Sequence, residues 1–476
     1  MDTVFGLDTV LLSRVQFGFT IAFHIVFPAF TIGLSAFIAT LEVLWLRSKA
    51  PHLHTLARFW TKVFAVSFAM GVVSGIVLEY QLGTNWARFG AIIGNTLAPL
   101  FAYEVLTAFF LEASFLGAML FGWNRFPPWL HVTSSILVAL GTALSGFWIL
   151  AANSWMHTPA GFAIQDGITY PVDWVKVIFN PSFPYRFAHM MTAAYLTTSL
   201  VVAAAGARYL LVGRHEAEAR TMLKMGLGML AILAPVQAFI GDLHGLNTLE
   251  HQPAKVAAIE AHWKDEGHAV PLVLFAWPDP KNERNDFEIA VPQLGSIILT
   301  HTWAGSFKGL SDFPRDERPP VAPVFFSFRA MVGIGLLMIA TGWIGVWLLW
   351  RQRIAQARWF LRPLQHAWPL GFAAIIFGWM VTEIGRQPWI AHGVLRTADA
   401  VSPVTPHQVL VSLALFVLVY GVVFGIGIWY IQRMIRKGPQ PHEPGPETLP
   451  NRPLAGGRPD PTDDDSATAR KGAVAT

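Results

Sequence analysis

The sequence predicts an all-α polytopic membrane protein with nine transmembrane helices. Hydrophobic residues make up 53% of the 476 residues and charged residues only 13%, against roughly 25% charged residues in an average soluble domain. Several apolar runs are also long enough to cross the roughly 30 Å hydrocarbon core of a bilayer. These runs fit poorly with the alternative, the buried helices of a large soluble protein.

The nine helices follow from the apolar runs, taken in chain order. The predicted spans are residues 15–46, 60–80, 97–122, 131–152, 187–212, 221–242, 325–350, 367–388 and 408–432. Together they make a transmembrane domain over residues 1–435.

The distribution of Lys and Arg predicts the orientation of these helices. One set of short connections carries 16 Lys and Arg residues, and the opposite set carries six. Because the richer side of a membrane protein is cytoplasmic, the N-terminus is predicted outside and the C-terminus inside. The isoelectric point near 9.3 therefore reflects membrane topology, and we expect no nucleic-acid partner.

Two segments lie outside the spans. Residues 243–324 form a long outer loop with 11 Asp and Glu against seven Lys and Arg, and its stretch "AKVAAIEAHWK" is predicted to be helical. Loops of this length are usually functional or disordered. Residues 436–476 are rich in Pro, Gly and Asp, which predicts a disordered cytoplasmic tail.

The chain contains no cysteine. This excludes disulfides, iron–sulfur clusters, haem-thiolate iron and covalently attached c-type haem. Any haem must be held by His, Met or a carboxylate. The N-terminal "MDTVFGLDTVLLSR" has no basic segment before its apolar run, so we do not expect a cleaved signal peptide.

Ionisable side chains inside the predicted spans are functional candidates, because charge is costly at membrane depth. Among them are His24, Glu79, Glu104, Glu112, His189, Arg329, Glu383 and Arg386, together with Met331, whose sulfur can bind iron.

His189 and Met331 are predicted at similar depth near the outer face, on two different helices. A His and a Met on opposite faces of a haem give a six-coordinate, low-spin iron suited to electron transfer. The alternative is a structural histidine bonded to a backbone carbonyl, with the methionine filling the core.

The other candidates suit metal or proton chemistry. His24 has no polar neighbour within a turn and needs a partner, either a metal or a carboxylate. Glu383 is predicted in the outer half of its helix. Glu104 and Glu112 are separated by about 12 Å along one helix, with Glu104 in the outer half and Glu112 nearer the centre. Such staggered carboxylates suit a proton relay, and capping or salt-bridged glutamates are the alternative.

Three rival classes fit the residues less well. A haem–copper oxidase needs about six buried histidine ligands, and only His24 and His189 are predicted well inside spans. The membrane cytochrome b of a quinone-linked dehydrogenase usually holds two haems with four histidines. A proton-coupled transporter would show paired halves with broken helices, which we do not find. Bound haem would discriminate the last class.

Several long motifs, in a fixed order, resemble one known family. They are "SRVQFGFTIAFHIVFP", "APLFAYEVLTAFFLEASFLG", "FPYRFAHM", "AKVAAIEAHW", "FFSFRAMVG" and "GWMVTEIGRQPW". Over nearly all of residues 1–435 the chain resembles subunit I of the cytochrome bd quinol oxidases. The short stretch between "AVPQLGS" and "FFSFR" resembles the short-loop class, which includes the cyanide-insensitive oxidases.

The resemblance implies roles for individual residues. His189 and Met331 would ligate a low-spin haem b, and His24 and Glu383 would each ligate one iron of an active-site pair. Glu104 would face the oxygen-reducing haem and Glu112 would lie on the proton path. Arg329 and Arg386 would pair with haem propionates, and Trp379 would pack between haems. Lys255, Glu260 and Asp242 would belong to the quinol site in the outer loop.

The resemblance also implies an activity and partners. The expected cofactors are two haem b groups and haem d, or a third b-type haem in its place. The expected activity is oxidation of quinol at the outer face and reduction of O2 to water, which generates proton motive force without pumping. Subunit II, and possibly a small single-span subunit, would assemble with the chain in the bacterial cytoplasmic membrane.

Overall fold

The computed structural model describes residues 3–265 and 267–440, and these residues are mostly helical. Within them, eight helices are long and apolar enough to cross a membrane. The number rises to nine if α12 (Arg358–Leu364) and α13 (Trp368–Ile384), which meet at a bend of 48°, count as one span. The architecture is that of an all-α polytopic membrane protein.

The long helices extend beyond the predicted spans, since hydropathy detects the apolar centre and misses the ends. They are α1 (Thr9–Ser48), α2 (Pro51–Thr84), α3 (Ala87–Tyr103) continuing through the π-helical segment η1 (Glu104–Phe109) into α4 (Phe110–Phe121), α5 (Pro128–His157), α7 (Phe183–Val212), α8 (Glu216–His251), α11 (Val321–Trp350) and α14 (Pro406–Lys437). Local capping sets several of these ends. The Asp8 carboxylate accepts a hydrogen bond from the backbone of Leu11 at the start of α1, and Thr405 and Gln408 form a capping box at the start of α14.

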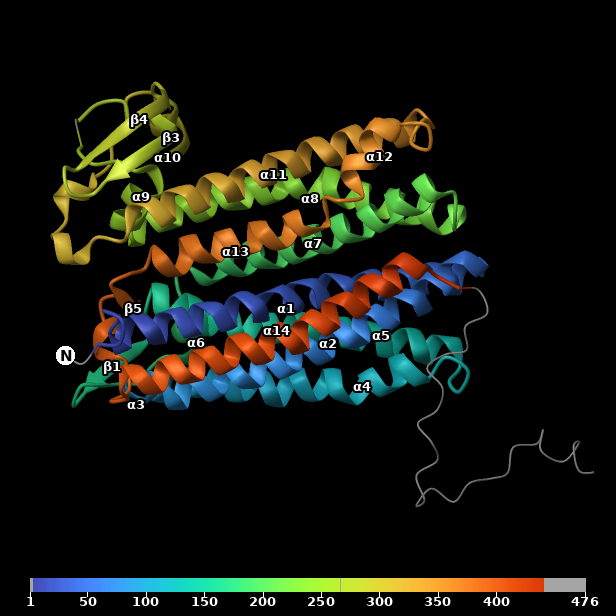
Figure 1. The fold of residues 1–476 in the computed structure, drawn as a ribbon, viewed down its shortest axis with the longest axis horizontal. Coiled ribbons are helices and arrows are strands. Elements are labelled where there is room, and N and C mark those ends of the chain that lie inside the picture. Colours follow the sequence, from blue (N-terminus) through green and yellow to red (C-terminus); the bar gives the residue numbers. More distant parts are fainter. Residues whose placement is uncertain (1–2, 266, 441–476) are drawn as a thin grey trace, which may run out of the picture.

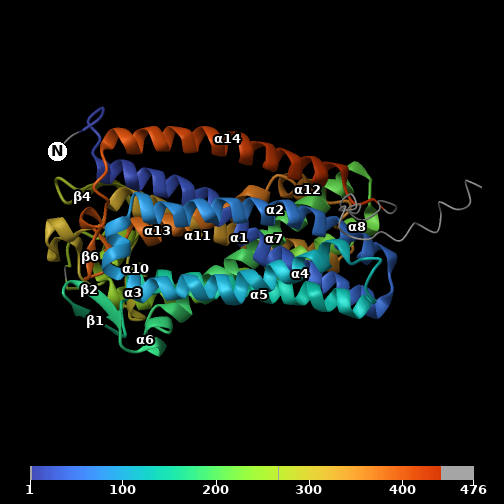
Figure 2. The same cartoon turned by 90° about the horizontal axis from the view of Figure 1, so that it is seen from below.

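The helices pack in two groups (Figures 1 and 2). One group contains α7, α8, α11 and α13, which contact one another extensively. The other contains α1, α2, α5 and the continuous α3–α4 helix, with α14 packed against α1 and α2. Contacts of α1 with α7 and α13 join the two groups.

All three hairpins and three of the short helices gather at one end of the long helices, together with the start of the chain (Figure 1). They include three antiparallel hairpins: β1 (Phe162–Gln165) with β2 (Ile168–Pro171), β3 (Leu272–Asp279) with β4 (Arg284–Val291), and β5 (Trp389–Ala391) with β6 (Leu395–Arg396). These short helices are α6 (Trp174–Ile178), α9 (Pro253–Glu260) and α10 (Leu294–Thr300). We call this end of the molecule the hairpin end.

The predicted outer loop, residues 243–324, is mostly ordered structure at the hairpin end. Its first residues continue α8 as far as His251, and α9 confirms the helix predicted in "AKVAAIEAHWK" as far as Glu260. A carboxylate in the turn of the β3–β4 hairpin ties this hairpin to the chain before α11. Glu283 accepts hydrogen bonds from Arg318, Ser311 and Arg315, and these bonds, that from Arg318 foremost, lower the pKa of Glu283 to about 2.

The C-terminal helix is longer than predicted. Because α14 continues to Lys437, the first residues of the predicted tail, 436–476, are helical. Residues 441–476, which make up the rest of that tail, lie outside the described residues.

Candidate functional site

One helix, α5, contacts three of the predicted carboxylates, Glu104, Glu112 and Glu383. The Ser145 hydroxyl donates to Glu104 at 2.6 Å, and Asn153 donates to Glu383 at 2.9 Å. Gly141 packs against Glu112 so closely that an added methyl group would lie 2.7 Å from its Cγ. The candidate carboxylates therefore lie along the length of one helix, between the two ends of the molecule.

Glu104 begins the π-helical segment η1. Such segments are rare in proteins and frequent at functional sites, because they insert one extra residue into the helix and redirect the side chains. The side chain of Glu104 is partly exposed, and that of Glu112, two turns further on, is 5% exposed. The sequence gives no local signal for this segment.

The helix that carries Glu104 begins earlier than predicted. The sequence places Glu104 in the outer half of a span beginning at residue 97, but the helix begins ten residues earlier, at Ala87. Glu104 is consequently at the midpoint of the 35-residue span Ala87–Phe121. Glu112 lies in the half of that span away from the hairpin end.

His24 on α1 is held by a serine from α2. The Ser74 hydroxyl donates its single proton to the carbonyl oxygens of Met70 and Gly71, at 3.0 and 2.9 Å. Its lone pair therefore accepts from Nδ1–H of His24, at 2.9 Å. In a neutral imidazole this leaves the Nε2 lone pair free, which is the arrangement found in metal-ligating histidines. Ser74 thus fixes His24 in the form that can bind iron.

We expect Ser74→Ala to lower the haem affinity of the His24 site by about 10- to 100-fold. This is the usual cost of losing a residue that hydrogen-bonds to a metal ligand. Haem content and the reduced optical spectrum of the purified complex would measure this. Ser67→Ala is the matched control, since the Ser67 hydroxyl is buried on the same helix and donates to Val63. Equal haem content in the two variants would contradict the role of Ser74.

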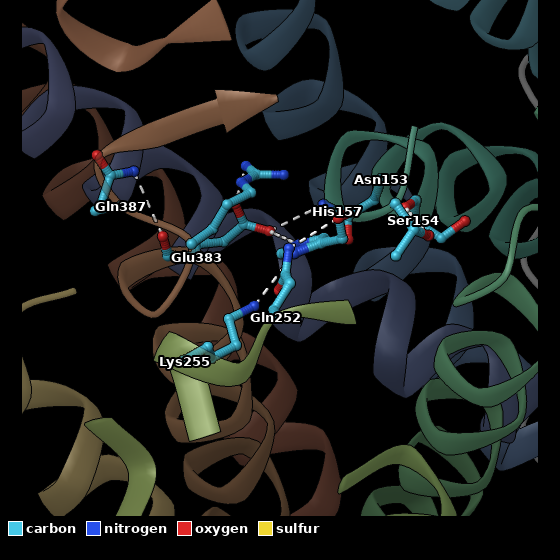
Figure 3. Close-up of polar contacts among 9 residues, drawn as sticks. Asn153, Ser154, His157, Gln252, Lys255, Glu383 and Gln387 are labelled. Carbon is cyan, nitrogen blue, oxygen red and sulfur yellow. Dashed lines mark hydrogen bonds and ion pairs between the residues drawn. The ribbon is translucent and has the colours of Figure 1, made fainter. Parts of the chain in front are cut away.

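Glu383 lies near the end of α13, in a buried polar cluster at the hairpin end (Figure 3). Its carboxylate forms an ion pair with Arg386 one turn on, accepts from Asn153 and lies 3.4 Å from Nε2 of His157. The sequence predicts iron for Glu383 and a propionate for Arg386. The structure pairs them with each other as well, since residues three apart on a helix face the same side.

A buried lysine from the outer loop reaches the same cluster. Lys255, on α9, is 3% exposed, and its ammonium donates to Nδ1 of His157 at 3.2 Å. Burial, with the nearby Arg186 and Arg386, holds the pKa of Lys255 well below its usual value, and Glu383 partly offsets this effect. Lys255, His157 and Glu383 therefore form a continuous line from the loop to a candidate iron ligand (Figure 3).

Basic side chains outnumber carboxylates in this cluster. Arg186, Arg386 and Lys255 all interact electrostatically with Glu383, and the three cationic side chains are 3–6% exposed. Nε of Arg186 and both Nε and Nη1 of Arg386 are buried without a hydrogen-bond partner. Leaving buried N–H donors without an acceptor costs free energy. These donors therefore favour the binding of another anionic group in the cluster.

His189 on α7 and Met331 on α11 belong to the same group of helices, and each lies against a glycine. A methyl group at Gly241 of α8 would lie 3.4 Å from the His189 ring, and one at Gly378 of α13 would lie 2.9 Å from the Met331 sulfur. Nδ1 of His189 is buried without a partner, which leaves the imidazole incompletely satisfied within the protein.

Arg329, two residues before Met331, contacts the outer loop. It forms an ion pair with Glu260 of α9 at 2.7 Å and donates to the Val273 carbonyl at 2.8 Å. Glu260, a predicted quinol residue, is 5% exposed. This ion pair links the outer loop to the helix that carries Met331.

The last two candidates lie further from these contacts. Asp242, on α8, is paired with His301 at 3.5 Å and is 34% exposed. Trp379, one turn before Glu383 on α13, is half-buried.

The helices contain more histidines than the predicted spans do. The ends of α5 and α8 extend beyond the predicted spans, so His157 and His244 are also within helices, and His131 is 3% exposed. His244 faces His189, with 5.6 Å between ring centroids. Among the described residues, no three His, Cys, Asp or Glu side chains are grouped to hold a single metal ion.

The residues fit haem as the bound group. Single His, Met and carboxylate side chains come from separate helices, as axial ligation requires. The helix glycines beside His24, His189 and Met331 remove side chains that would crowd these ligands; a methyl group at Gly75 would lie 3.3 Å from the His24 ring. The unpaired guanidinium donors of Arg186 and Arg386 suit the carboxylates of a porphyrin.

Comparison with known proteins agrees with this chemistry. Residues 12–439 match the family model of cytochrome bd terminal oxidase subunit I. The chain is 35% identical to the cytochrome bd ubiquinol oxidase subunit 1 of Bacillus subtilis (strain 168), over 91% of this chain and 94% of the relative. It is 32% identical to the cytochrome bd-II ubiquinol oxidase subunit 1 of Escherichia coli (strain K12), over 91% and 97%. The solved bd oxidase from Geobacillus thermodenitrificans is similar, with a TM-score of 0.85, 33% identity and coverage of 91% of this chain and 99% of that one.

Proposed function

The chain belongs to the family of cytochrome bd oxidase subunit I, and from this we propose that it oxidises quinol at the hairpin end and reduces O2 to water within the helix bundle. The observation that carries the proposal is the placement of His24, His189 and Met331, each against a helix glycine. The family is that of haem-dependent quinol oxidases, so the chain is an oxidoreductase subunit.

Haem would be held by four side chains. His189 and Met331 would hold a low-spin haem b, and His24 and Glu383 would each hold one haem of the oxygen-reducing pair. That pair would be a haem b with a haem d, or with a third b-type haem in its place. When bound, these groups supply electron transfer and oxygen reduction. Arg186 and Arg386 would neutralise propionates, as their unpaired donors suggest.

The quinol site would lie at the outer loop, where Lys255 and Glu260 come from the same short helix. The Arg329–Glu260 ion pair would fix the carboxylate near the quinol hydroxyls, and Asp242 would lie at the edge of this site. Names of relatives include ubiquinol, but the residues here suit any quinol headgroup.

Protons for water formation would come from the opposite end of the molecule. Glu112, against Gly141, would take a proton from that side and pass it towards Glu104 and its partner Ser145. Quinol oxidation would release protons at the hairpin end. Proton motive force would follow from these two locations without a pumping element.

This scheme requires nine spans, with α12 and α13 forming one, the hairpin end outside and the C-terminus in the cytoplasm of a bacterial inner membrane. Subunit II of the oxidase, and possibly a small single-span subunit, would complete the complex. A C-terminal reporter fusion tests the orientation, and activity of the reporter outside the cell would reverse the proton scheme.

The decisive experiment is a reduced-minus-oxidised optical spectrum of the purified complex, repeated with carbon monoxide. A low-spin b signal with a carbon-monoxide-sensitive band in the far red is expected if haem d is present. The same response without the far-red band would assign a b-type haem in its place. Absence of haem would overturn the proposal and favour the transporter class.

We expect Glu112→Ala to slow oxygen consumption by roughly 100-fold or more, the usual contribution of a positioned proton-transfer group, with haem content unchanged. Glu112→Asp keeps a carboxyl group and should recover part of the rate. Turnover equal to that of the unmodified protein in Glu112→Ala would remove Glu112 from the proton path.

A further inference from the structure

A buried carboxylate–imidazole pair lies away from the hairpin end, between α1 and α5. Glu42 is six residues from the end of α1, and His131 is three residues into α5. Nδ1 of His131 is 3.0 Å from Oε2 of Glu42, and the two side chains are 3% and 0% exposed. The buried Ser135 hydroxyl donates to both carboxyl oxygens at 2.9 Å. An ionisable pair buried within apolar spans is a functional candidate, and the function proposed above does not use it.

The hydrogen bonds place one exchangeable proton inside this pair. Nε2 of His131 lies 3.2 Å from the Met119 carbonyl oxygen, which can only accept, so Nε2 carries a proton and donates it. Nδ1 and Oε2 must then share a second proton. Either Glu42 is a neutral acid that donates to Nδ1, or His131 is an imidazolium that donates to a carboxylate. Both arrangements have zero net charge, so the proton moves within the pair without creating an unbalanced buried charge.

On one side the pair connects to partly exposed groups. The Trp123 ring lies 4.0 Å from the His131 ring, and the His54 ring lies 5.2 Å from Trp123. Arg58 also lies over Trp123, at 5.7 Å, and its Nη2 is buried without a partner. His54 and Arg58 are only half-buried. A titratable imidazole and a guanidinium therefore lie between the buried pair and the surface at this end.

On the other side, α5 runs from the pair to the contact with Glu112. Gly141, which contacts Glu112, is six residues after Ser135, or about 9 Å along the helix axis. That distance corresponds to about three hydrogen bonds of ~2.8 Å. The buried hydroxyls of Ser35 and Thr142, 3.1 Å apart, lie on the same α1–α5 contact, next to Gly141. These two hydroxyls place polar atoms between the pair and Glu112, within the contact of α1 with α5.

We propose that Glu42 and His131 form a proton-holding pair that supplies Glu112 from the end of the molecule opposite the hairpins. The proposal rests on the proposed oxidase function and adds the entry point of its proton path. In the same reaction, the pair would hold each proton before it reaches Glu112.

Glu42→Gln in the assembled complex tests the proposal. The amide is isosteric, can still accept from Ser135 and can donate to Nδ1, but it cannot carry the proton. Oxygen consumption should fall roughly 10-fold or more, because proton transfer by a positioned side chain contributes on the order of 10²–10⁴ and water can replace part of it. The rate ratio between H2O and D2O should rise. Haem content and the optical spectrum should stay as in the unmodified complex.

Infrared difference spectra between oxidised and reduced enzyme give a second readout, which a structural hydrogen bond would not change. A deuterium-sensitive carboxylic acid band should be present in the unmodified complex and absent in Glu42→Gln. Thr198→Val is the matched control, since it removes another buried bond to α1, from Thr198 to the Phe30 carbonyl at 3.1 Å. The control should keep its turnover and its infrared band.

The outcomes separate this inference from the function on which it rests. No quinol oxidation by the unmodified complex would refute the oxidase function itself. An active complex in which Glu42→Gln keeps full turnover and the infrared band would leave the function standing and overturn the proton-holding role. His131→Gln tests the same proton from the other partner, and its slowed turnover with normal haem content would support the pair even if Glu42→Gln failed to assemble.

Discussion

Replacing His189 by alanine is expected to abolish the low-spin haem signal and to reduce quinol oxidation by more than about 100-fold. The effect is this large because losing an iron ligand costs more than losing a residue that only hydrogen-bonds to a ligand. His189 is the one histidine on α7, its Nδ1 has no protein partner, and Gly241 leaves room beside its ring. Removing the imidazole leaves the Met331 sulfur, a weak ligand by itself. Optical spectra and quinol-dependent oxygen consumption of the purified complex measure both effects.

Two further variants make the result specific. Met331→Ala should remove the same signal, because one iron would need both ligands. His251→Ala, at a half-buried histidine that bonds to the Asn247 carbonyl within its own helix, should leave the spectrum intact. A normal low-spin spectrum in His189→Ala would show that the His189–Met331 assignment is wrong.

Replacing Glu383 by glutamine is expected to destabilise the hairpin end by about 3–5 kcal/mol, the usual cost of breaking a buried ion pair. The amide keeps the shape and the hydrogen bond from Asn153, but it leaves Arg186, Arg386 and Lys255 without their anion. The variant should also lose one haem of the oxygen-reducing pair, since an amide is a poor iron ligand. Thermal unfolding and haem content of the complex measure the two effects separately.

Glu283→Gln is the matched control for Glu383→Gln. Glu283 also binds two arginines, Arg315 and Arg318, but it lies in the turn of the β3–β4 hairpin. Because Glu283 contacts no candidate haem ligand, this variant should keep its haem. A Glu383→Gln complex as stable as Glu283→Gln, with full haem content, would contradict the role of Glu383.

Local sequence patterns were sufficient to find the helices and most of the candidate ligands. His24, Met331 and Glu383 stand out because each is a metal-binding residue type inside an apolar run. The ends of the helices were less predictable, since capping and the polar residues beyond the membrane decide them. The helix that carries Glu104 starts ten residues before the predicted span, which is about 15 Å along the helix axis.

The partners of these residues could not be predicted, because they come from distant parts of the chain. Asn153 is 230 residues from Glu383, and Glu42 is 89 residues from His131. Glu42 lies inside a predicted span but is not among the predicted candidates. Neither is Arg186, although it is buried and interacts with Glu383.

The contacts of α5 with Glu42, Glu112, Glu104 and Glu383 make its residue spacing a functional constraint. In an α-helix each residue turns the face by about 100° and advances by 1.5 Å. Deleting one residue between Ser135 and Gly141 would rotate the whole hairpin-end half of α5 relative to the other half. Ser145, Asn153 and His157 would then turn away from their carboxylates together, while Ser135 stayed on Glu42. Length changes in α5 should therefore be far less tolerated than substitutions on its exposed face, and a library of single-residue deletions would show this as one continuous intolerant segment.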